Sequence, residues 1–493
     1  MIKAKLEEIL RDTDAIFQTD VDFNKEVTVT EDASNVDGDS LLFLTHLASG
    51  EQREIRLSGT PYAIVCEEDD AKRLGSERLI ITDNSRIALA YAYRNLYKIS
   101  RGSMKYVAVT GTNGKTTVAE MICSILKFTG ADVGYIGTGT IRINDTPICE
   151  KYYSMTTPDP DLLYRSIKDM ELFGCKYVVI EASSHGLALG KLAPLEFDVG
   201  IFTNLSEEHR DFHPTMSDYL EAKLSLFDKC EVGIFNLDCP YSARAYELAT
   251  CKKESVGIIN RGDVYATDIQ LRGIRGSYFY YRENGLIFGV DLALAGAFNI
   301  YNSLMALRCA IDLGIKPCIA KRAINCLSSI EGRMEIFGNE VSVVIDYAHT
   351  PLAVENTLKT LYSAKKPRQS LYLVIGCGGE RDRKKRAEIG RIAEKYVKKI
   401  YITEDNSRNE DPEQIITDIM GGVKDPDAAV IIPSRAEAIR QAILNAERGD
   451  IIAILGKGRE CYMITSDGYT DFSDKQEALS ALRLRKAKNE TNA

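Results

Sequence analysis

Residues 110–117 read Thr110-Gly111-Thr112-Asn113-Gly114-Lys115-Thr116-Thr117 and join an apolar, strand-like run (106–110) to a helix expected to begin near Thr116. At such a turn, glycines let backbone N–H groups surround a phosphate, the lysine reaches the β and γ phosphates, and the threonine hydroxyl binds Mg²⁺. The usual pattern G-x-x-x-x-G-K-[ST] places glycine at position 109, where this chain has Val109, so the loop is a variant. It favours a nucleotide site over a glycine-rich turn without ligand, and it does not define the reaction.

Strand-like and helix-length segments alternate after this loop, whereas residues 1–102 mix short helices and strands. Apolar runs occur at 177–180, 200–202 and 232–235, and again at 341–345, 371–375, 400–403, 430–432 and 451–455. Strands separated by helices imply parallel α/β sheets. At roughly 100–200 residues per domain, the 493 residues suggest about three domains. We predict an N-terminal domain (1–102), a central phosphate-loop domain (103–333) and a C-terminal domain (334–493).

The composition excludes several classes of protein. Hydrophobic residues make up 45% and charged residues 27% of the chain, so several cores can form and global disorder is excluded. The 62 basic and 71 acidic residues give a net charge of −9, which argues against non-specific nucleic-acid binding. No apolar run is long enough to span a membrane. The twelve cysteines form no C-x-x-C pair, so we expect free thiols in a reducing cytoplasm rather than disulfides or a metal cluster.

A carboxylate and a group of histidines follow the phosphate loop. Glu181 comes directly after the strand-like run 177–180, and the carboxyl end of a parallel strand beside a phosphate loop is a usual place for a Mg²⁺ ligand; the alternative is a surface glutamate. Three of the five histidines, His185, His209 and His213, lie close together in the sequence, and His349 lies in a further motif. In a chain with so few histidines, this concentration favours a functional role.

Residues 217–227 have the pattern of an amphipathic helix, with Ser217 as its expected N-cap. Leu220, Lys223, Leu224 and Phe227 share one face by their i, i+3, i+4, i+7 spacing. A lysine on an apolar stripe is unusual. From this pattern alone, the favoured interpretation is an aliphatic stem on the apolar face with its amine at the edge.

Taken together, the motifs resemble those of the Mur ligases, the ATP-dependent amide-forming enzymes of peptidoglycan synthesis. The matching segments are 110–117, 181–186, 204–213, 222–227, 296–302, 331–333 and 346–351, in the family's order and spacing from about residue 104 onward. The resemblance implies an N-terminal uridine-nucleotide domain, a central ATPase-like domain with a parallel sheet and a C-terminal Rossmann-like domain. It also implies a cytoplasmic, monomeric enzyme that acts on small molecules and binds neither nucleic acid nor membrane.

The resemblance assigns roles to individual residues. ATP would contact Gly111, Thr112, Asn113, Gly114, Lys115, Thr116 and Thr117, with Asn302 at the adenine, Arg333 at a phosphate and Asp346 at the ribose. The Mg²⁺ ligands would come from Thr116, Glu181, His209 and Lys223. Lys223 matches the lysine that the family carries as a carbamate, which would account for a lysine on an apolar stripe. The catalytic set would be Lys115, Glu181, His209 and Lys223, acting through an acyl phosphate that an incoming amine attacks.

The segments 376–382, 405–408 and 456–460 are similar to the family members that add the third residue of the peptide. In those members Asp-Asn-Pro-Arg accompanies meso-diaminopimelate, and lysine-adding members lack the arginine. This chain has Asp405-Asn406-Ser407-Arg408, and the planar fork of the retained arginine can grip a second carboxylate, so diaminopimelate is favoured over L-lysine. The predicted amino-acid contacts are Arg381, Asp405, Asn406, Ser407, Arg408, Gly456 and Glu460.

The N-terminal domain departs from the family pattern. The predicted contacts to UDP-N-acetylmuramoyl-L-alanyl-D-glutamate are Ser34, Thr156, Thr157, Ser183 and Lys191. The family's Asp-Ser-Arg becomes Asp32-Ala33-Ser34-Asn35 here, Met155 stands in place of Asn, and Lys191 stands in place of Arg. Three hypotheses stay open: a ligase adding diaminopimelate or lysine, a related ligase with a different carboxylate acceptor, and a nucleotide-binding protein without ligase activity.

Overall fold

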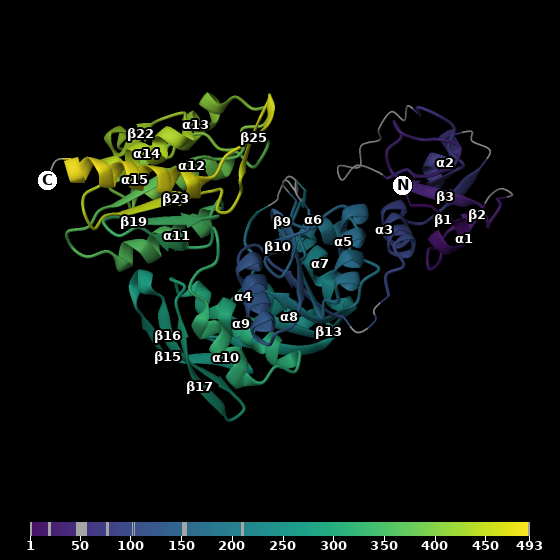
Figure 1. Cartoon of the computed structure of the whole chain (residues 1–493), viewed down its shortest axis with the longest axis horizontal. Helices are drawn as coiled ribbons and strands as arrows, with labels where there is room; N and C mark the ends of the chain where they lie inside the picture. The colour runs from purple at the N-terminus through teal and green to yellow at the C-terminus, as the bar shows by residue number, and fades with distance from the viewer. Residues whose placement is uncertain are drawn as a thin grey trace.

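The computed structural model describes residues 2–17, 21–45, 57–74, 78–100, 102, 104–149, 155–208 and 212–491. Three α/β bodies follow one another in chain order, each built on its own sheet, with the central body between the other two (Figure 1). The predicted fold class, α/β with parallel sheets, is confirmed. The expected boundary at 102 and 103 falls beside Arg101 and Ser103, which lie outside the described residues.

The N-terminal sheet has the strand order β1-β3-β4-β5-β6-β2. Its strands are β1 (Ala4–Lys5), β2 (Ile16–Phe17), β3 (Glu26–Thr30), β4 (Ser40–Phe43), β5 (Ala63–Cys66) and β6 (Leu79–Ile81), and its helices are α1 (Leu6–Ile9), α2 (Glu68–Leu74) and α3 (Ser85–Leu96). Strands β3 to β6 are parallel. Helix α3 packs against this sheet and against helix α5 of the central body, so it joins the two cores.

The central sheet has the order β10-β9-β8-β11-β7-β12-β13-β14-β15-β16-β17. Its middle strands are parallel to one another, namely β8, β11, β7, β12, β13, β14 and β15. The strands are β7 (Lys105–Thr110), β8 (Val133–Gly137), β9 (Thr140–Ile143), β10 (Thr146–Pro147), β11 (Tyr177–Glu181), β12 (Phe197–Phe202), β13 (Cys230–Asn236), β14 (Lys252–Gly257), β15 (Val264–Leu271), β16 (Ser277–Glu283) and β17 (Leu286–Leu292). The helices are α4 (Lys115–Phe128), α5 (Pro160–Phe173), α6 (Ser184–Ala188), α7 (Met216–Leu224), α8 (Pro240–Leu248), α9 (Phe298–Asp312) and α10 (Pro317–Cys326), with 3₁₀ turns η1 (Ser225–Lys229) and η2 (Gly273–Arg275).

Strand β7 shows why the central sheet is buried on both faces. Tyr106 and Ala108 join the core on one side, whereas Val107 and Val109 join the core that contains α4 and α9 on the other. Successive side chains of a strand point to opposite faces, so an apolar run without alternation is typical of a strand covered by helices on both sides. Strand β7 is thus covered on both faces, and its last residue, Thr110, begins the phosphate loop at the carboxyl edge of the sheet.

The C-terminal sheet has the order β18-β19-β23-β20-β21-β22, parallel except for β18. Its strands are β18 (Glu335–Phe337), β19 (Ser342–Asp346), β20 (Leu371–Ile375), β21 (Lys399–Ile402), β22 (Ala429–Ile431) and β23 (Ile451–Leu455), and a separate hairpin is formed by β24 (Tyr462–Thr465) and β25 (Gly468–Asp471). The helices are α11 (Pro351–Ala364), α12 (Lys384–Glu394), α13 (Pro412–Met420), α14 (Arg435–Asn445) and α15 (Asp474–Thr491), with the 3₁₀ turn η3 (Pro426–Ala428). The five strands predicted here are confirmed to within one residue at each end.

The N-cap of helix α7 is Thr215 rather than Ser217, so the helix begins two residues earlier than the predicted cap indicates. The Thr215 side chain accepts from the Asp218 amide, and the Asp218 carboxylate accepts from the Thr215 amide at 3.0 Å. This reciprocal capping box satisfies two N–H groups that would otherwise lack partners. Ser217 instead donates to Glu221 at 3.3 Å on the helix surface.

The structure bears on two expectations from composition, the state of the cysteines and the presence of membrane-spanning helices. All twelve cysteines fall in the described part of the chain and are free thiols, as predicted. Among the helices described, none combines the length and the apolar character that crossing a bilayer requires.

Arg435 and Asp474 form a fully buried ion pair between α14 and α15, with 2.7 Å bonds from Nε to Oδ1 and from Nη2 to Oδ2. Removing one partner leaves a buried charge without compensation, so Asp474→Asn is expected to lower the free energy of unfolding by about 3–5 kcal/mol. Urea-induced unfolding measures the change. The matched control is Glu388→Gln, which removes an exposed pair with Arg391 at 3.6 Å and is expected to cost under about 0.5 kcal/mol. Equal changes in the two variants would contradict this prediction.

Candidate active site

The phosphate loop is held in its curved shape by two residues that follow strand β12. Gly111 has a φ of 140°, and a Cβ there would lie 1.9 Å from Thr203 Oγ1, so no larger residue fits. Thr203 Oγ1 donates to the Asn113 carbonyl at 2.7 Å, and the Asn204 side chain bonds the Asn113 amide at 3.0 Å and its carbonyl at 2.9 Å. The loop is therefore preformed at the N-terminus of α4, where partial positive charge favours phosphate.

Two lysines donate to the same carbonyl of this loop. Lys115 donates to Gly111 at 3.0 Å and to Thr112 at 2.9 Å, and Lys223 of α7 donates to Gly111 at 3.0 Å. Burial lowers the pKa of Lys115 and, together with the charge of Lys115, lowers the pKa of Lys223 well below its usual range. Lys223 is 1% exposed, so the interpretation of an amine at the edge of the apolar face is wrong. The buried amine is shifted toward its neutral form.

Glu181 ends β11 and is fully buried at the carboxyl edge of the sheet. Its Oε2 accepts from the hydroxyls of Thr116 at 3.0 Å and Thr138 at 3.1 Å, and its Oε1 accepts from the Tyr135 hydroxyl. A carboxylate and a hydroxyl beside a phosphate loop are oxygen ligands that suit Mg²⁺, which takes its other ligands from water and substrate phosphates. In the described parts of the chain, no group of three or more His, Cys, Asp or Glu forms a metal site made of protein alone. Glu181 and Thr116 therefore fit Mg²⁺ in company with a nucleotide.

The histidines near α7 are placed differently from one another. His209 lies outside the described residues. His185 and His213 pack against Phe212, with ring centroids 4.0 Å and 4.8 Å away, and His213 stacks on Tyr219 at 4.9 Å. The Tyr219 ring in turn lies 4.6 Å from Lys223 Nζ. This aromatic cluster holds α7, and with it Lys223, against the loop.

A cavity of about 410 Å³ is lined by the phosphate loop and by the segment that connects the central and C-terminal bodies. The lining includes residues 112–117, Glu181, Glu208, Asn302, Arg333, Asp346, Tyr347 and His349. All the predicted ATP contacts except Gly111 thus line one cavity, and the Gly111 carbonyl accepts from Lys223 instead. Its size and its mixed polar lining suit a nucleotide.

Arg333 and Asp346 border this cavity from the connecting segment and from strand β19. Arg333 Nη2 donates to the Thr116 hydroxyl at 2.7 Å, and its guanidinium lies 4.4 Å from the Tyr347 ring centroid. Asp346 accepts from the amides of Met334 at 2.7 Å and Ala348 at 2.8 Å, and burial raises its pKa. Arg333 therefore lies beside the phosphate loop, and its contact with a phosphate, like the ribose contact of Asp346, stays a prediction.

A second cavity, of about 340 Å³, is lined by most of the predicted amino-acid contacts, namely Arg381, Asp405, Asn406, Arg408, Gly456 and Glu460. Its floor is held by the buried Lys457, which donates to Asn406 at 3.0 Å, Glu460 at 3.2 Å and Asp405 at 3.3 Å. Burial alone would raise the pKa of Asp405, but the charges of Lys457 and Arg435 lower it to about 2. Ser407, the remaining member of the predicted set, is buried and is not among the residues that line this cavity.

Arg408 is held in an unusual backbone conformation, with a φ of 54°. Its Nη1 donates to the Gly379 carbonyl at 2.8 Å and to the Asn406 carbonyl at 3.3 Å. Burial and the neighbouring charge of Arg381 lower the pKa of Arg408, and both arginines line this cavity. Two cations in the lining favour an anionic group in the cavity.

The two cavities share a wall made of Glu208, Tyr347, His349 and Arg381. His349 Nε2 lies 3.0 Å from Glu208 Oε1, so the C-terminal body contacts the central body at this junction. The sequence motifs 204–213 and 346–351 contain these residues, but no feature of the sequence indicated that the two motifs meet.

Three of the predicted acceptor contacts form a chain of hydroxyls beside Glu181. Thr157 Oγ1 donates to the Glu181 carbonyl at 2.9 Å and lies 3.0 Å from Ser183 Oγ. Thr156 Oγ1 lies 3.0 Å from Thr138 Oγ1, which binds the Glu181 carboxylate. These hydroxyls therefore border the region where phosphates and a substrate carboxylate would meet.

The other two predicted acceptor contacts lie apart. Lys191 Nζ pairs with Asp159 at 2.7 Å and contacts the Thr157 carbonyl at 3.4 Å, so it adjoins the hydroxyl chain. Ser34 is exposed in a turn of the N-terminal body, where its amide and hydroxyl donate to Asp32 at 2.9 Å and 2.6 Å. The structure thus brings Lys191 to the site and leaves Ser34 bonded within its own turn.

Comparison with known proteins agrees with this arrangement. The chain matches the Mur ligase middle domain over residues 109–310 and the Mur ligase, glutamate ligase domain over residues 332–458. It therefore belongs to the Mur ligase family. The UDP-N-acetylmuramoyl-L-alanyl-D-glutamate–2,6-diaminopimelate ligase of Syntrophomonas wolfei is 37% identical over 420 residues, covering 83% of this chain and 84% of that protein. The ligase of the same name from Aquifex aeolicus is 37% identical over 418 residues, covering 84% of each.

Solved structures extend the likeness to nearly the whole chain. One of a UDP-N-acetylmuramoyl-L-alanyl-D-glutamate–2,6-diaminopimelate ligase has a TM-score of 0.67 at 28% identity, covering 98% of this chain and 100% of that one. The folylpolyglutamate synthase of Mycobacterium tuberculosis has a TM-score of 0.62 at 17% identity, covering 76% of this chain and 92% of that one, and so shares the fold.

Proposed function

We propose that this protein is an ATP- and Mg²⁺-dependent cytoplasmic ligase that adds meso-diaminopimelate to UDP-N-acetylmuramoyl-L-alanyl-D-glutamate in peptidoglycan precursor synthesis. The observation that carries the proposal is the wall shared by the two cavities. A carboxylate activated at the phosphates can there meet an amine that is held by the second cavity. The names of the curated relatives support the same acceptor and the same amino acid.

The first step transfers the γ-phosphoryl group of ATP to the acceptor carboxylate, giving an acyl phosphate and ADP. Lys115 and the loop N–H groups contact the phosphates, and Arg333 at the Thr116 hydroxyl neutralises charge that develops during transfer. Thr116 and Glu181 would hold Mg²⁺, which supplies further charge neutralisation when bound. A carbamate formed on Lys223 would add a negative group behind the loop.

In the second step the amine of the amino acid attacks the acyl carbonyl, and phosphate leaves from the tetrahedral intermediate as the amide bond forms. The second cavity orients that amine, because its polar side chains are fixed by Lys457 before the substrate arrives. Arg381 lines both cavities, so it lies close to the point where the two substrates meet.

The amino-acid selectivity is expected to depend on Arg408. Arg408→Leu removes one of two arginines that line the second cavity, so the KM for diaminopimelate should rise about 30- to 100-fold, whereas use of L-lysine, which lacks the second carboxylate, should change little. Phosphate release measured with each amino acid checks this. Arg383→Ala is the matched control, because Arg383 is exposed and pairs with Glu410 at 3.0 Å. Equal losses with both amino acids would show that Arg408 only supports the loop.

The function itself is tested with purified protein, ATP, Mg²⁺ and the muramoyl dipeptide nucleotide, offered diaminopimelate or L-lysine in turn. The proposal expects phosphate release that requires both the nucleotide and diaminopimelate. Release that requires L-lysine instead would make this a lysine-adding ligase. Release that needs an amino acid but not the dipeptide nucleotide would reject that nucleotide as the acceptor, because the only other carboxylate in the mixture is that of the amino acid. ATP binding without release would also reject it and would leave either a ligase with another carboxylate acceptor, which the departures around Ser34 favour, or a nucleotide-binding protein.

A further inference from the structure

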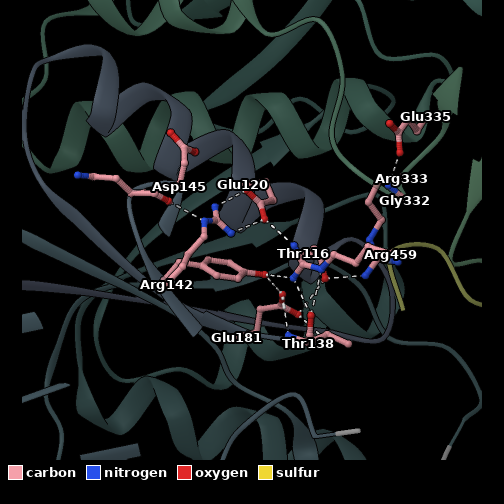
Figure 2. A network of polar contacts seen from close by, with 12 residues as sticks. Thr116, Glu120, Thr138, Arg142, Asp145, Glu181, Gly332, Arg333, Glu335 and Arg459 are labelled. Atoms are coloured by element: carbon pink, nitrogen blue, oxygen red, sulfur yellow. Dashed lines mark hydrogen bonds and ion pairs between the residues drawn. The ribbon is translucent and has the colours of Figure 1, made fainter. Parts of the chain in front are cut away.

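Arg459 extends from the C-terminal body into the central sheet. Its Nη1 donates to Glu120 Oε1 at 2.8 Å, and its Nη2 donates to the Tyr135 hydroxyl at 2.8 Å and to the Thr138 carbonyl at 2.7 Å (Figure 2). These partners belong to α4, β8 and the turn after β8, more than 300 residues earlier in the chain. These hydrogen bonds therefore exist only while the C-terminal body is packed against the central body.

Tyr135 links this arginine directly to Glu181. The Tyr135 oxygen receives a hydrogen bond from Arg459, and a guanidinium can only donate. The single hydroxyl hydrogen of Tyr135 is thus directed to Glu181 Oε1. Thr138, whose carbonyl binds Arg459, donates its hydroxyl to Glu181 Oε2 at 3.1 Å. Both oxygens of the carboxylate that faces Thr116 are therefore oriented by residues that Arg459 holds.

The part of the central body that binds Arg459 stays charge-balanced without it. Arg142 binds both oxygens of Glu120, at 2.9 Å and 2.6 Å, so this carboxylate has a cation of its own in the central body. Burial opposes the ionised form, yet Arg142 and Arg459 together lower the pKa of Glu120. Loss of Arg459 leaves Glu120 paired, which lets the arginine arrive and depart without exposing a buried charge.

The backbone on either side of Arg459 connects it to both cavities. Gly332 has a φ of 65°, and a Cβ there would lie 2.2 Å from the Arg459 nitrogen, so the segment that carries Arg333 packs directly on this loop. Lys457 and Glu460, in the same loop, hold the floor of the amino-acid cavity. Figure 2 shows Arg333 and Arg459 entering the Thr116–Glu181 region from neighbouring segments.

We propose that Arg459 is a positioning residue that couples the contact between the C-terminal and central bodies to the orientation of the Glu181 side chain. The carboxylate that would face Mg²⁺ is then fully oriented only when the loop 456–460, which borders the second cavity, is in place. This inference rests on the proposed function for its catalytic readout. Arg459 acts through Tyr135 and Thr138, and it is not among the residues that line either cavity.

The first test is Arg459→Ala in the full-length protein. Its kcat for diaminopimelate-dependent phosphate release is expected to fall about 30- to 100-fold, with the KM for ATP at saturating Mg²⁺ within about threefold of wild type. Arg459→Lys should recover part of the loss, because one ammonium cannot reach all three acceptors. Arg391→Ala, an exposed arginine of α12, is the control and should change kcat less than about twofold. An unchanged kcat in Arg459→Ala would overturn the proposal.

A double-mutant cycle with Tyr135→Phe separates coupling from general destabilisation. If Arg459 acts through the Tyr135 hydroxyl, the double variant should be no slower than the slower single variant. Losses that multiply would overturn the coupling. Should Arg459→Ala not fold, Arg459→Lys takes its place in the cycle.

A binding readout keeps this inference separate from the proposed reaction. The Mg²⁺ concentration for half-maximal binding of a non-hydrolysable ATP analogue should rise severalfold in both Arg459→Ala and Tyr135→Phe. This measurement needs no turnover, so it is informative even if wild-type protein does not use diaminopimelate or the dipeptide nucleotide, a result that would reject the function alone. The same Mg²⁺ dependence in wild type and Arg459→Ala would reject the coupling.

Discussion

Lys223→Ala is expected to abolish ligation, with a loss of at least about 10³-fold in kcat. The amine is 1% exposed, has a pKa lowered well below its usual range and lies 3.0 Å from the Gly111 carbonyl, so it is available in the neutral form that reacts with CO₂. That reaction converts the neutral amine into a carbamate anion and releases one proton, so it places a negative charge at the loop. Phosphate release with ATP, Mg²⁺, the dipeptide nucleotide and diaminopimelate measures the loss.

Chemical rescue and a matched substitution identify the form of Lys223 that acts. A small carboxylate such as formate should restore part of the activity of Lys223→Ala, because it can occupy the space that the side chain leaves. Lys223→Arg keeps the positive charge but cannot form a carbamate, so it should be as inactive as Lys223→Ala and should not be rescued. Activity in Lys223→Arg would show that a cation suffices, and wild-type turnover in Lys223→Ala would refute the role altogether.

Glu181→Gln is expected to lower kcat/KM by about 10²- to 10³-fold and to remove the Mg²⁺ dependence of nucleotide binding. Glutamine keeps the size of the side chain but replaces one acceptor oxygen with an NH₂ group among the hydroxyls of Thr116, Thr138 and Tyr135. Thermal unfolding with ADP, measured with and without Mg²⁺, checks the binding effect: wild type should gain stability from Mg²⁺ and the variant should not.

Asp450→Asn provides the control for a buried carboxylate. Asp450 is 2% exposed and accepts from the amides of Ser370 and Glu447, both at 2.7 Å, within the C-terminal body. Its substitution should lower stability while the gain from Mg²⁺ and ADP stays intact. A Mg²⁺ effect that persists in Glu181→Gln would assign the metal to other ligands.

Much of the phosphate site could be predicted from local sequence, because its chemistry is local. Backbone N–H groups, Lys115 and Thr116 come from one turn, and the glycines are required by the φ of Gly111 and the approach of Thr203. Glu181 was predictable because it ends an apolar strand, and parallel strands end at a common edge. The predicted cap of α7 is wrong, because Thr215 and Asp218 cap each other's amides whereas Ser217 lies on the helix surface.

The residues predicted to contact the amino acid come from three separate motifs, and most of them line the second cavity. Their contact with an amino acid stays a prediction. The motifs could not show that Ser407 is buried away from the cavity lining, nor that Lys457 binds Asp405 and Asn406. The two bonds from Lys457 join residues 52 and 51 positions apart, which the packing of distant segments brings together.

The sequence by itself determined the α/β class, the phosphate loop and the chemical identity of most cavity residues, because strand periodicity and turn chemistry depend on near neighbours. Only the tertiary structure decided that Lys223 is buried against Gly111, that Glu208 meets His349, and that Arg459 binds Glu120 and Tyr135. Each of these depends on how far-separated segments pack, and burial and long-range pairing are what set the charge of Lys223 and the orientation of Glu181.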